Sequence, residues 1–384
     1  MNVLHVIDSL AASGGAENGL VREVTRFGND IRQEIVLLYH RRDLAPELEA
    51  AGIGIESVGL AEGAGSRAWP RALQPVSRVA RAFRPDVIQT SLFLGNMVGQ
   101  MVGRRLGVPV VSNLVLSGDL DSLRSYQPGA GTRRAALLRS IAGWAARSPL
   151  IRFRALTEEV RQTNARLLGV DPARIEVIPR GVPEPTLLSS ATREDLGLPQ
   201  GPLVVNVGRL VPQKGQVQLV EAFAKVRDRV PSAHLVIVGQ DGVAKGGVSD
   251  AIERLGLTGA VTLAGQSSRV TEYLAQANVF AFTSVMEGLG TAVLEAMAQG
   301  VPVVAFDIPP VREATVDGAY GTLVPVGDVD SFASALLPHL SGERRVDVRA
   351  RDWVRSHHDL GRIAAEVERL LREAARAGDG SGGR

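Results

Sequence analysis

The sequence predicts an α/β protein of two domains, each built on a doubly wound parallel sheet. Short apolar strands alternate with helical patterns along the whole chain of 384 residues. Three prolines fall within residues 179–185, which marks a break between two halves of ordinary domain size. Each half opens with an apolar strand, and a glycine-containing loop follows that strand at 12–17 and at 208–215.

The first predicted domain covers residues 1–183. Its strands are rich in Val, Ile and Leu, which is typical of strands buried on both faces of a parallel sheet. We expect them at Val3–Ile7, Glu34–Tyr39, Ile55–Val58, Asp86–Gln89, Val108–Val111, Arg152–Ala155 and Ile175–Ile178. Helical patterns lie between these strands, for example at Ala16–Phe27 and Pro70–Phe83.

The second predicted domain covers residues 184–355. Its expected strands are Leu203–Gly208, Leu235–Val238, Val261–Leu263, Val279–Phe282 and Val301–Ala305. A C-terminal helix is predicted within 356–376, where Ile363–Arg376 is rich in Ala, Leu and Arg. The glycine-rich end, 377–384, is predicted to be disordered.

Composition excludes several classes of protein. The chain has no cysteine, which excludes disulfides, thiolate nucleophiles and cysteine metal sites and fits a reducing compartment. The first strand begins at once, without a basic leader, and no apolar run is long enough to span a bilayer. We therefore expect a cytoplasmic protein. Its basic residues are nearly all arginine, as in GC-rich genomes, and its formal net charge is only +2, so we expect no nucleic-acid partner.

The two glycine loops match neither the dinucleotide fingerprint G-x-G-x-x-G nor a Walker loop, which disfavours a dehydrogenase or a P-loop enzyme. In parallel α/β sheets, ligands bind at the carboxyl ends of the strands. Two such sheets joined by a linker therefore predict a ligand site in the cleft between the two domains.

Residues 279–298 form the most informative segment. They are typical of a buried strand, a loop bracketed by Gly288 and Gly290, and a helix that starts near Thr291. Uncovered backbone N–H groups and a helix N-terminus together make an anion site suited to a diphosphate. Glu287 on the loop and Glu295 in the helix do not suit phosphate, so we interpret them as acceptors for sugar hydroxyl groups.

Arg209 and Lys214 follow the first strand of the second half, and we expect them to face this phosphate loop. A departing diphosphate needs fixed positive charge, which an arginine supplies as a two-pronged donor and a lysine as a point charge. The chain has only three lysines, Lys214, Lys225 and Lys245, and Lys214 is followed by a glycine.

The pair Glu287 and Glu295, with seven residues between them, and the pattern G-R-x-x-x-x-K-G at 208–215 resemble motifs of retaining glycosyltransferases of family 4. The resemblance covers nearly the whole chain and implies the GT-B fold, in which the C-terminal helix packs back on the first domain. It also implies that Arg209, Lys214 and Glu287 are catalytic. The implied donor-binding residues are Gly14, Gly15, Asn113, Gly208, Gly239, Gln266, Gly288, Leu289, Gly290, Thr291 and Glu295.

The resemblance gives several of these residues a specific role. Gly14 and Gly15 resemble the family's N-terminal glycine loop, which lets the backbone approach donor phosphate and acceptor. Gly239 occupies the place of a glycine turn beneath the nucleotide, and Gln266 the place where the nucleobase is read. Glu295 would meet the ribose, while Glu287 would meet the sugar that is transferred.

One departure from the family pattern concerns the stretch after Val108–Val111. Many family members carry a catalytic-site histidine there, whereas this chain has Ser112-Asn113 and continues to Asp119 without histidine. Two interpretations stay open: Asn113 hydrogen-bonds the donor sugar in place of the histidine, or Asp119 is an acceptor-side group.

The six histidines show no metal-ligand spacing with carboxylates, and family 4 enzymes generally need no metal. We therefore expect no metal site and no cofactor. A nucleotide-diphosphate sugar would be the donor substrate, and a hydroxyl group of a glycan, lipid-linked or small molecule would be the acceptor. The acceptor pocket would lie in the loops at 60–67 and 115–131.

The stretch 132–147 predicts an apolar helix edged with arginine and carrying an exposed Trp144. The simpler interpretation is an amphipathic helix packed on the first sheet. The alternative is peripheral contact with an anionic membrane, at its inner face, which would suit a lipid-linked acceptor.

These observations predict a retaining hexosyltransferase that works by a front-face mechanism. One alternative is a GT-B sugar-nucleotide epimerase, which needs no acceptor and which the two motifs together disfavour. Another is a nucleotide-sugar-binding partner subunit with weak or no turnover, an interpretation that the missing histidine supports. The sequence does not indicate the oligomeric state.

Overall fold

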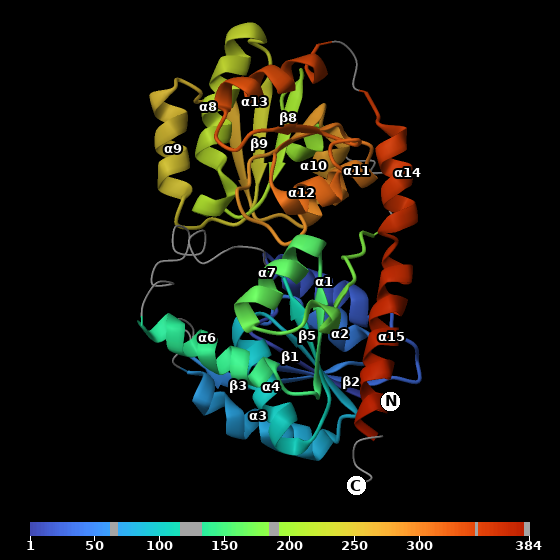
Figure 1. The fold of residues 1–384 in the computed structure, drawn as a ribbon. Helices are drawn as coiled ribbons and strands as arrows, with labels where there is room; N and C mark the ends of the chain where they lie inside the picture. The colour runs from blue at the N-terminus through green and yellow to red at the C-terminus, as the bar shows by residue number, and fades with distance from the viewer. Residues whose placement is uncertain (62–67, 116–132, 184–191, 342–344, 380–384) are drawn as a thin grey trace. The chain divides into compact units, whose positions relative to one another are not determined.

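The computed structural model describes residues 1–61, 68–115, 133–183, 192–341 and 345–379 (Figure 1). The chain divides into two compact units, Met1–Gly181 with Leu360–Arg384, and Val182–Asp359. Each unit contains one sheet, and all strand pairs of both sheets are parallel. The predicted α/β class with two doubly wound sheets is therefore confirmed.

The sheet of the first unit has the strand order β3-β2-β1-β4-β5-β6-β7. Its strands are β1 (Asn2–Ile7), β2 (Arg32–Tyr39), β3 (Gly54–Leu60), β4 (Val87–Ser91), β5 (Val110–Leu114), β6 (Ile151–Ala155) and β7 (Ile175–Val177). The direction in which new strands are added reverses between β1 and β4. Ligands of doubly wound sheets bind beside such a switch point.

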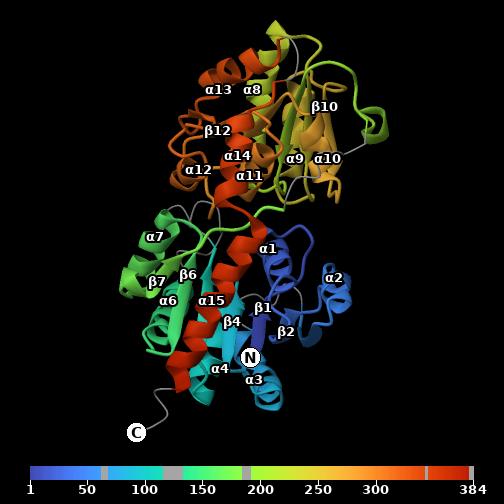
Figure 2. The same cartoon turned by 90° about the vertical axis from the view of Figure 1, so that its right-hand side faces the viewer.

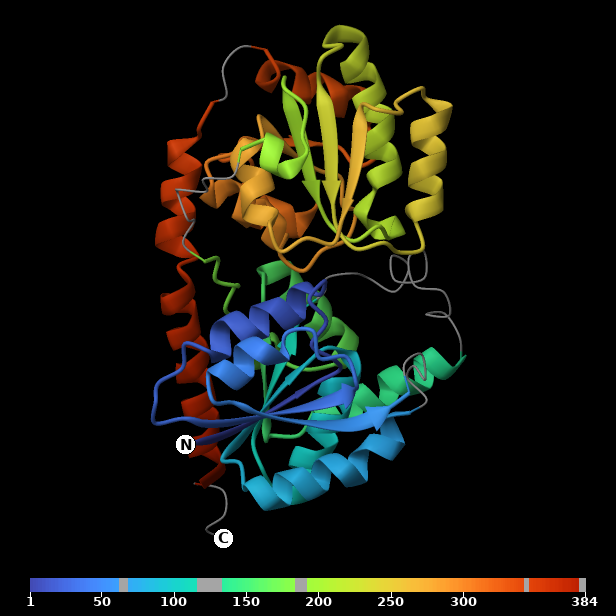
Figure 3. The same ribbon diagram turned by 180° about the vertical axis from the view of Figure 1, so that it is seen from behind.

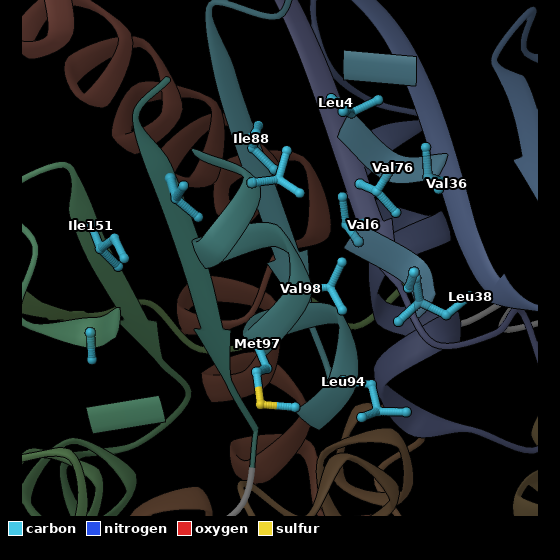
Figure 4. Close-up of a cluster of buried hydrophobic side chains, with 14 of the residues drawn as sticks. Leu4, Val6, Val36, Leu38, Val76, Ile88, Leu94, Met97, Val98 and Ile151 are labelled. Atoms are coloured by element: carbon cyan, nitrogen blue, oxygen red, sulfur yellow. The ribbon is translucent and has the colours of Figure 1, made fainter. Parts of the chain in front are cut away.

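Helices cover both faces of this sheet (Figure 1). They are α1 (Gly15–Val24), α2 (Ala45–Ala50), α3 (Trp69–Phe83), α4 (Phe93–Leu106), α6 (Arg133–Ala146), α7 (Glu158–Leu168) and α15 (Leu360–Asp379), with a 3₁₀ turn η2 (Pro172–Arg174). Successive side chains of a strand point to opposite faces, so each strand supplies two cores. Leu4 and Val6 of β1 pack towards α3 and α4, as Figure 4 shows.

The second core of this unit contains Val3 and Ile7 on the opposite face of β1, together with side chains of α1 and α15. α15 lies beside α1 and β4 (Figure 2). It contributes an apolar stripe at helical spacing, which is the amphipathic pattern of a helix that packs on a core. The stripe consists of Ile363, Ala364, Val367, Leu370, Leu371 and Ala374.

The sheet of the second unit has the order β10-β9-β8-β11-β12-β13. Its strands are β8 (Leu203–Val207), β9 (His234–Val238), β10 (Val261–Gly265), β11 (Val279–Phe282), β12 (Val303–Phe306) and β13 (Thr322–Val324). The helices are α8 (Gln216–Arg229), α9 (Lys245–Arg254), α10 (Val270–Gln276), α11 (Thr291–Ala298), α12 (Pro309–Ala314), α13 (Val329–Leu336) and α14 (Val348–His357). Short 3₁₀ turns are η3 (Glu194–Leu196), η4 (Pro212–Lys214) and η5 (Leu337–His339). Figure 3 shows α8 and α9, in yellow-green and yellow, beside this sheet, and both contribute to its core.

Several predicted boundaries move in the structure. The first unit ends at Gly181, and residues 356–359 belong to the second unit rather than to the last helix. The reason is local: the Val182 N–H donates to the His358 carbonyl over 2.8 Å, and Val182 bridges Asp359, so the chain leaves helical hydrogen bonding there. α15 consequently starts only at Leu360.

The end of the chain also differs from the prediction. α15 continues to Asp379, so residues 377–379 are helical and not disordered. Gly378 lies against Pro109, where an added Cβ would be 2.4 Å from the proline Cγ, so the last turn still packs on the first unit. Residues 380–384 lie outside the described part of the chain, as do 62–67 and 116–131 of the predicted acceptor loops, with Asp119 among them.

Candidate functional site

The carboxyl ends of β10, β9, β8 and β11 lie next to one another in the second unit. The segments that follow these four strands carry Gln266, Gly239, Gly208 with Lys214, and the 288–291 loop respectively. Parallel strands end at the same edge of a sheet, so the structure brings these predicted residues to one edge.

The loop after β8 lies very close to the loop after β9. The Gly208 N–H donates to the Val238 carbonyl over 2.9 Å, and the Gly239 N–H donates to the Gly265 carbonyl over 2.8 Å. A Cβ added to Gly239 would lie 2.0 Å from the Gly208 carbonyl oxygen. Position 239 therefore accepts only glycine without a shift of one backbone or the other.

The loop after β8 is also bound to the loop after β11. The Thr283 Oγ1 donates to the Lys214 carbonyl over 3.0 Å, and the Val285 N–H donates to the Gln213 carbonyl over 2.9 Å. Gly215 has a φ of 64°, and an added Cβ would lie 2.2 Å from the Thr283 carbonyl oxygen. These contacts place η4 and its lysine beside the predicted phosphate loop.

Lys214 forms an ion pair with Glu287. The Nζ–Oε1 distance is 2.5 Å, and the two side chains are only 18% and 13% exposed. The ammonium group also lies 5.7 Å from the ring centroid of Phe282, and the lysine stem lies against Gly208. The structure thus joins two residues for which the sequence predicted separate partners.

Arg209 is exposed, and within the described residues its side chain forms no hydrogen bond or ion pair. Lys214, which was predicted to bind the same diphosphate, does have such an ion pair, with Glu287. The guanidinium group of Arg209, with five donors, is available to an anionic ligand.

The 288–291 loop leads into α11 as predicted. Gly290 is the N-cap with a φ of 78° and a ψ of 50°, a conformation that favours glycine, and it supplies no side-chain cap. Gly288 and Leu289 are buried beside it, and Thr291 is half-buried. The first N–H groups of a helix have no partner within the helix, so this uncapped N-terminus suits an anion. Glu295 lies half-buried one turn further along α11.

Gln266 is exposed and follows Gly265, which has a φ of 69° at the end of β10. It is therefore accessible at the same strand edge.

Gly14 and Gly15 belong to the first unit, where Gly14 is the N-cap of α1. The Glu17 carboxylate lies over Gly14, at 2.0 Å from the position of an added Cβ. Arg180 donates from Nη1 to the Gly15 carbonyl, and burial lowers its pKa to about 10. Two charged side chains of the protein thus contact this glycine pair. The sequence did not indicate a site role for either side chain: Glu17 lies in the first turn of a helix, where a carboxylate is favourable in any case, and Arg180 lies in a proline-rich linker, where burial is not expected.

Asn113 lies within β5 and not in the loop after it, because β5 reaches Leu114. Its Nδ2 donates to the Ser91 Oγ over 2.9 Å, while the buried Oδ1 has no partner among the residues that the structure describes. Asp8 follows β1 and accepts the Gly95 N–H over 2.6 Å. Burial raises the pKa of Asp8 to about 6, and the charge of Glu17 adds to that rise.

Among the described residues, no group of three or more His, Cys, Asp or Glu side chains could hold a metal ion. Nor does any helix in this part of the chain have the length and apolarity needed to cross a membrane.

The helix predicted at 132–147 is α6. Its Trp144 is 54% exposed, and the Arg104 guanidinium lies 4.1 Å from the centroid of the Trp144 ring.

Two family models match this chain. A glycosyl transferase 4-like domain covers residues 15–181, and glycosyl transferases group 1 covers residues 190–353. The 2-deoxystreptamine N-acetyl-D-glucosaminyltransferase of Streptomyces fradiae is 31% identical over 340 residues, which cover 83% of this chain and 78% of that relative. The chain belongs to the glycosyl transferases group 1 family.

Other known proteins are similar over most of the chain. The D-inositol 3-phosphate glycosyltransferase of Segniliparus rotundus is 27% identical over 71% of this chain, which spans only 62% of that relative. The crystal structure of Anabaena Alr3699/HepE in complex with UDP and glucose has a TM-score of 0.81 at 22% identity and covers 97% of this chain and 99% of its own. The fold is therefore that of the GT-B glycosyltransferases.

Proposed function

We propose that this chain transfers a hexose from a nucleotide-diphosphate sugar to a hydroxyl group and retains the anomeric configuration. The main observation in favour is the cluster at the strand edge of the second unit, where Arg209, the Lys214–Glu287 pair and the N-terminus of α11 come together. A group 1 family member with this cluster has the charges that a departing diphosphate requires.

Each part of the cluster has a role in the proposed reaction. Lys214 donates one of its three N–H groups to Glu287, which leaves two for phosphate oxygens. Arg209 adds a two-pronged donor, and the backbone N–H groups that start α11 add partial positive charge. Glu287 and Glu295 accept hydroxyl groups of the transferred sugar and of the ribose, and Gln266 lies where the nucleobase is read.

The proposed step is a front-face displacement. The bond between the anomeric carbon and the diphosphate oxygen breaks, and the acceptor oxygen attacks the same face. The departing diphosphate takes the acceptor's hydroxyl proton, so no protein nucleophile is needed. Such a step depends on charge stabilisation and on the exclusion of water.

The roles of the first unit are part of the proposal. Gly14 and Gly15 would let the α1 N-terminus approach the ligand, and the unpaired Oδ1 of Asn113 would accept a sugar hydroxyl. No metal or other cofactor is needed when Arg209, Lys214 and the helix N-terminus neutralise the diphosphate. We place the reaction in the cytoplasm, with peripheral membrane contact through α6 as the arrangement that a lipid-linked acceptor would require.

A donor panel tests the proposal. UDP-, GDP- and dTDP-sugars are scored by thermal shift, with UDP-glucose first because HepE has been crystallised with it. A donor at 100 times its dissociation constant should stabilise the protein by about 2.7 kcal/mol. Turnover with EDTA present and an anomeric proton of unchanged configuration by NMR are the expected results.

Other results of the donor panel and the product analysis would indicate other functions. An inverted product would contradict the retaining mechanism. Epimerised donor without acceptor would indicate the epimerase, and binding without transfer or hydrolysis would indicate the non-catalytic partner subunit.

A further inference from the structure

Gln216 is the first residue of α8 and follows Lys214 and Gly215 directly. It is a polar side chain that is only 2% exposed. Its Nε2 donates to the Gly208 carbonyl over 3.2 Å and to the Arg209 carbonyl over 3.0 Å. Both N–H groups of one amide are therefore used on two successive carbonyls of the loop after β8.

The other end of the same amide has no partner. The Gln216 Oε1 is buried without a hydrogen bond in the structure. The reverse orientation of the amide would place Oε1 against two carbonyl oxygens, so the observed orientation is the favourable one. A buried acceptor without a partner costs about 1–3 kcal/mol, which an apolar side chain of similar size would avoid. Against this cost stand its two hydrogen bonds, which an apolar side chain would not make, so the amide ties both carbonyls to the start of α8.

The two carbonyls lie on either side of the Arg209 Cα. Because peptide units are planar, the orientations of these two units determine φ and ψ of Arg209, and with them the direction of its Cα–Cβ bond. The Arg209 side chain is exposed and has no hydrogen bond or ion pair with the described residues that would orient it otherwise. Its direction consequently depends on its backbone.

We propose that Gln216 is a positioning residue that aims Arg209 at the diphosphate of the donor. The inference rests on the proposed function, since it takes Arg209 as a phosphate ligand. It adds to that function a residue that does not contact the substrate and acts through the backbone of the loop. Lys214, by contrast, has its ion pair with Glu287 to orient its ammonium group.

The test compares Gln216→Leu and Gln216→Glu with the wild type and with Gln218→Leu. Gln218 is a half-buried glutamine on the same helix whose side chain has no contact with the Gly208 or Arg209 carbonyls, so it is the matched control. Calorimetry measures the dissociation constants of UDP, GDP, ADP, dTDP and inorganic pyrophosphate, and a thermal scan measures Tm.

Gln216→Leu should weaken the best-binding probe about tenfold, as expected for loss of an oriented charged hydrogen bond. Its Tm should change little, because removal of the unpaired Oε1 offsets the loss of the two hydrogen bonds to the carbonyls. Gln216→Glu should weaken binding of the probe further, since a carboxylate repels both carbonyls and the ligand. In an Arg209→Ala background, Gln216→Leu should cause no additional loss, because the two residues act as one unit.

Three results would overturn the inference. Unchanged affinity in Gln216→Leu, or an equal loss in Gln218→Leu, would remove the positioning role while leaving the diphosphate site intact. A full additional loss in the Arg209→Ala background would show that Gln216 does not act through Arg209. Failure of the wild type to bind any probe would overturn the proposed function itself, and the inference with it.

Discussion

Lys214 and Arg209 differ in how the protein holds them, although both were predicted to bind the same diphosphate. Lys214 is largely buried and paired with Glu287, whereas Arg209 is exposed. A preorganised cation costs no reorganisation when negative charge develops beside it. The lysine is therefore already held in place by the protein, and under the proposed function the exposed arginine would take up its position on binding the diphosphate.

Arg209→Ala and Lys214→Ala should each lower turnover by a factor of hundreds, since one preorganised charge at a developing anion is worth about 3–4 kcal/mol. The fold should stay intact, because neither side chain is part of the apolar core of the second unit. Lys225→Ala is the control: Lys225 is half exposed, pairs with Asp330 and should leave kcat unchanged. A near-normal rate in either site variant would exclude that residue from the phosphate role.

Glu287→Gln and Glu295→Gln should separate transfer from donor binding. We expect Glu295→Gln to weaken donor binding, and Glu287→Gln to slow transfer with little loss of nucleoside diphosphate affinity. Removal of the Glu287 charge leaves Lys214 free for phosphate, which supports the second expectation. Competition with free nucleoside diphosphate measures the affinity of each variant. If Glu287→Gln, rather than Glu295→Gln, loses affinity for the diphosphate, then the assignments of Glu295 to the ribose and Glu287 to the transferred sugar are reversed.

Asp8→Asn should change how stability depends on pH. Burial raises the pKa of Asp8 from 3.8 to about 6, with a further contribution from Glu17. Between these two values the folded state holds a proton that the unfolded state has released, so this group's contribution to stability falls as pH rises from about 4 to 6. Above pH 6 the cost is at most about 3 kcal/mol. The asparagine Oδ1 can still accept the Gly95 N–H, so the variant should match the wild type at pH 4 and exceed it at pH 8.

The measurement is urea unfolding of both proteins across this range. Burial lowers the pKa of His5 to about 4, which makes its contribution to stability rise with pH over much of the same window. Both proteins contain His5, so its contribution cancels when the free energy of unfolding of the wild type is subtracted from that of Asp8→Asn at each pH. A difference that does not change with pH would contradict the expectation for Asp8.

At the scale of secondary structure, the loops after β8 and β9 approach through Gly208 and Gly239. Gly239→Ala places a Cβ 2.0 Å from a backbone oxygen, so the two strand ends must separate. We expect a loss of Tm and weaker nucleoside diphosphate binding. Gly246→Ala in α9 is the control, because nothing lies within 4 Å of its added Cβ and it should stabilise the protein by about 0.4–1 kcal/mol. Equal effects of the two substitutions would contradict the proposed close approach.

Most strands were predictable because they are short runs of apolar residues, as expected for strands buried in a parallel sheet. Of the thirteen strands in the described part of the chain, twelve were expected near their observed positions. β13 was missed because Thr322–Val324 is only three residues long and its threonine is exposed.

Candidate site residues could be predicted from the sequence where the side chain suits one kind of ligand, as the cationic Arg209 and Lys214 suit an anion. The contacts between these residues could not be predicted. Neither the Lys214–Glu287 ion pair nor the contacts of Gln216 and Arg180 follow from sequence spacing, because the two partners of each contact lie on different loops or helices.

At the scale of the whole molecule, the first unit is built from both ends of the chain. Truncation after Asp359 removes the six buried apolar side chains that α15 contributes to the second core of that unit. Loss of one such side chain typically costs about 2–5 kcal/mol, and a domain has about 5–15 kcal/mol in total. We expect calorimetry of the truncated chain to show the transition of the second unit and to lack that of the first. Two intact transitions would contradict a role of α15 in the first core.

Because α15 belongs to the first unit although it is translated last, the first unit cannot complete its core early in translation. Nascent chains usually fold domain by domain from the N-terminus. Here one face of the first sheet is covered only in part, by α1 among others, until α15 has left the ribosome, because Ile363, Val367 and Leu371 complete its core. The second unit, Val182–Asp359, is continuous and has all of its residues earlier. The half that is translated second is thus the half that can finish folding first, and the apolar face of the N-terminal half is the surface that a chaperone must protect in the meantime.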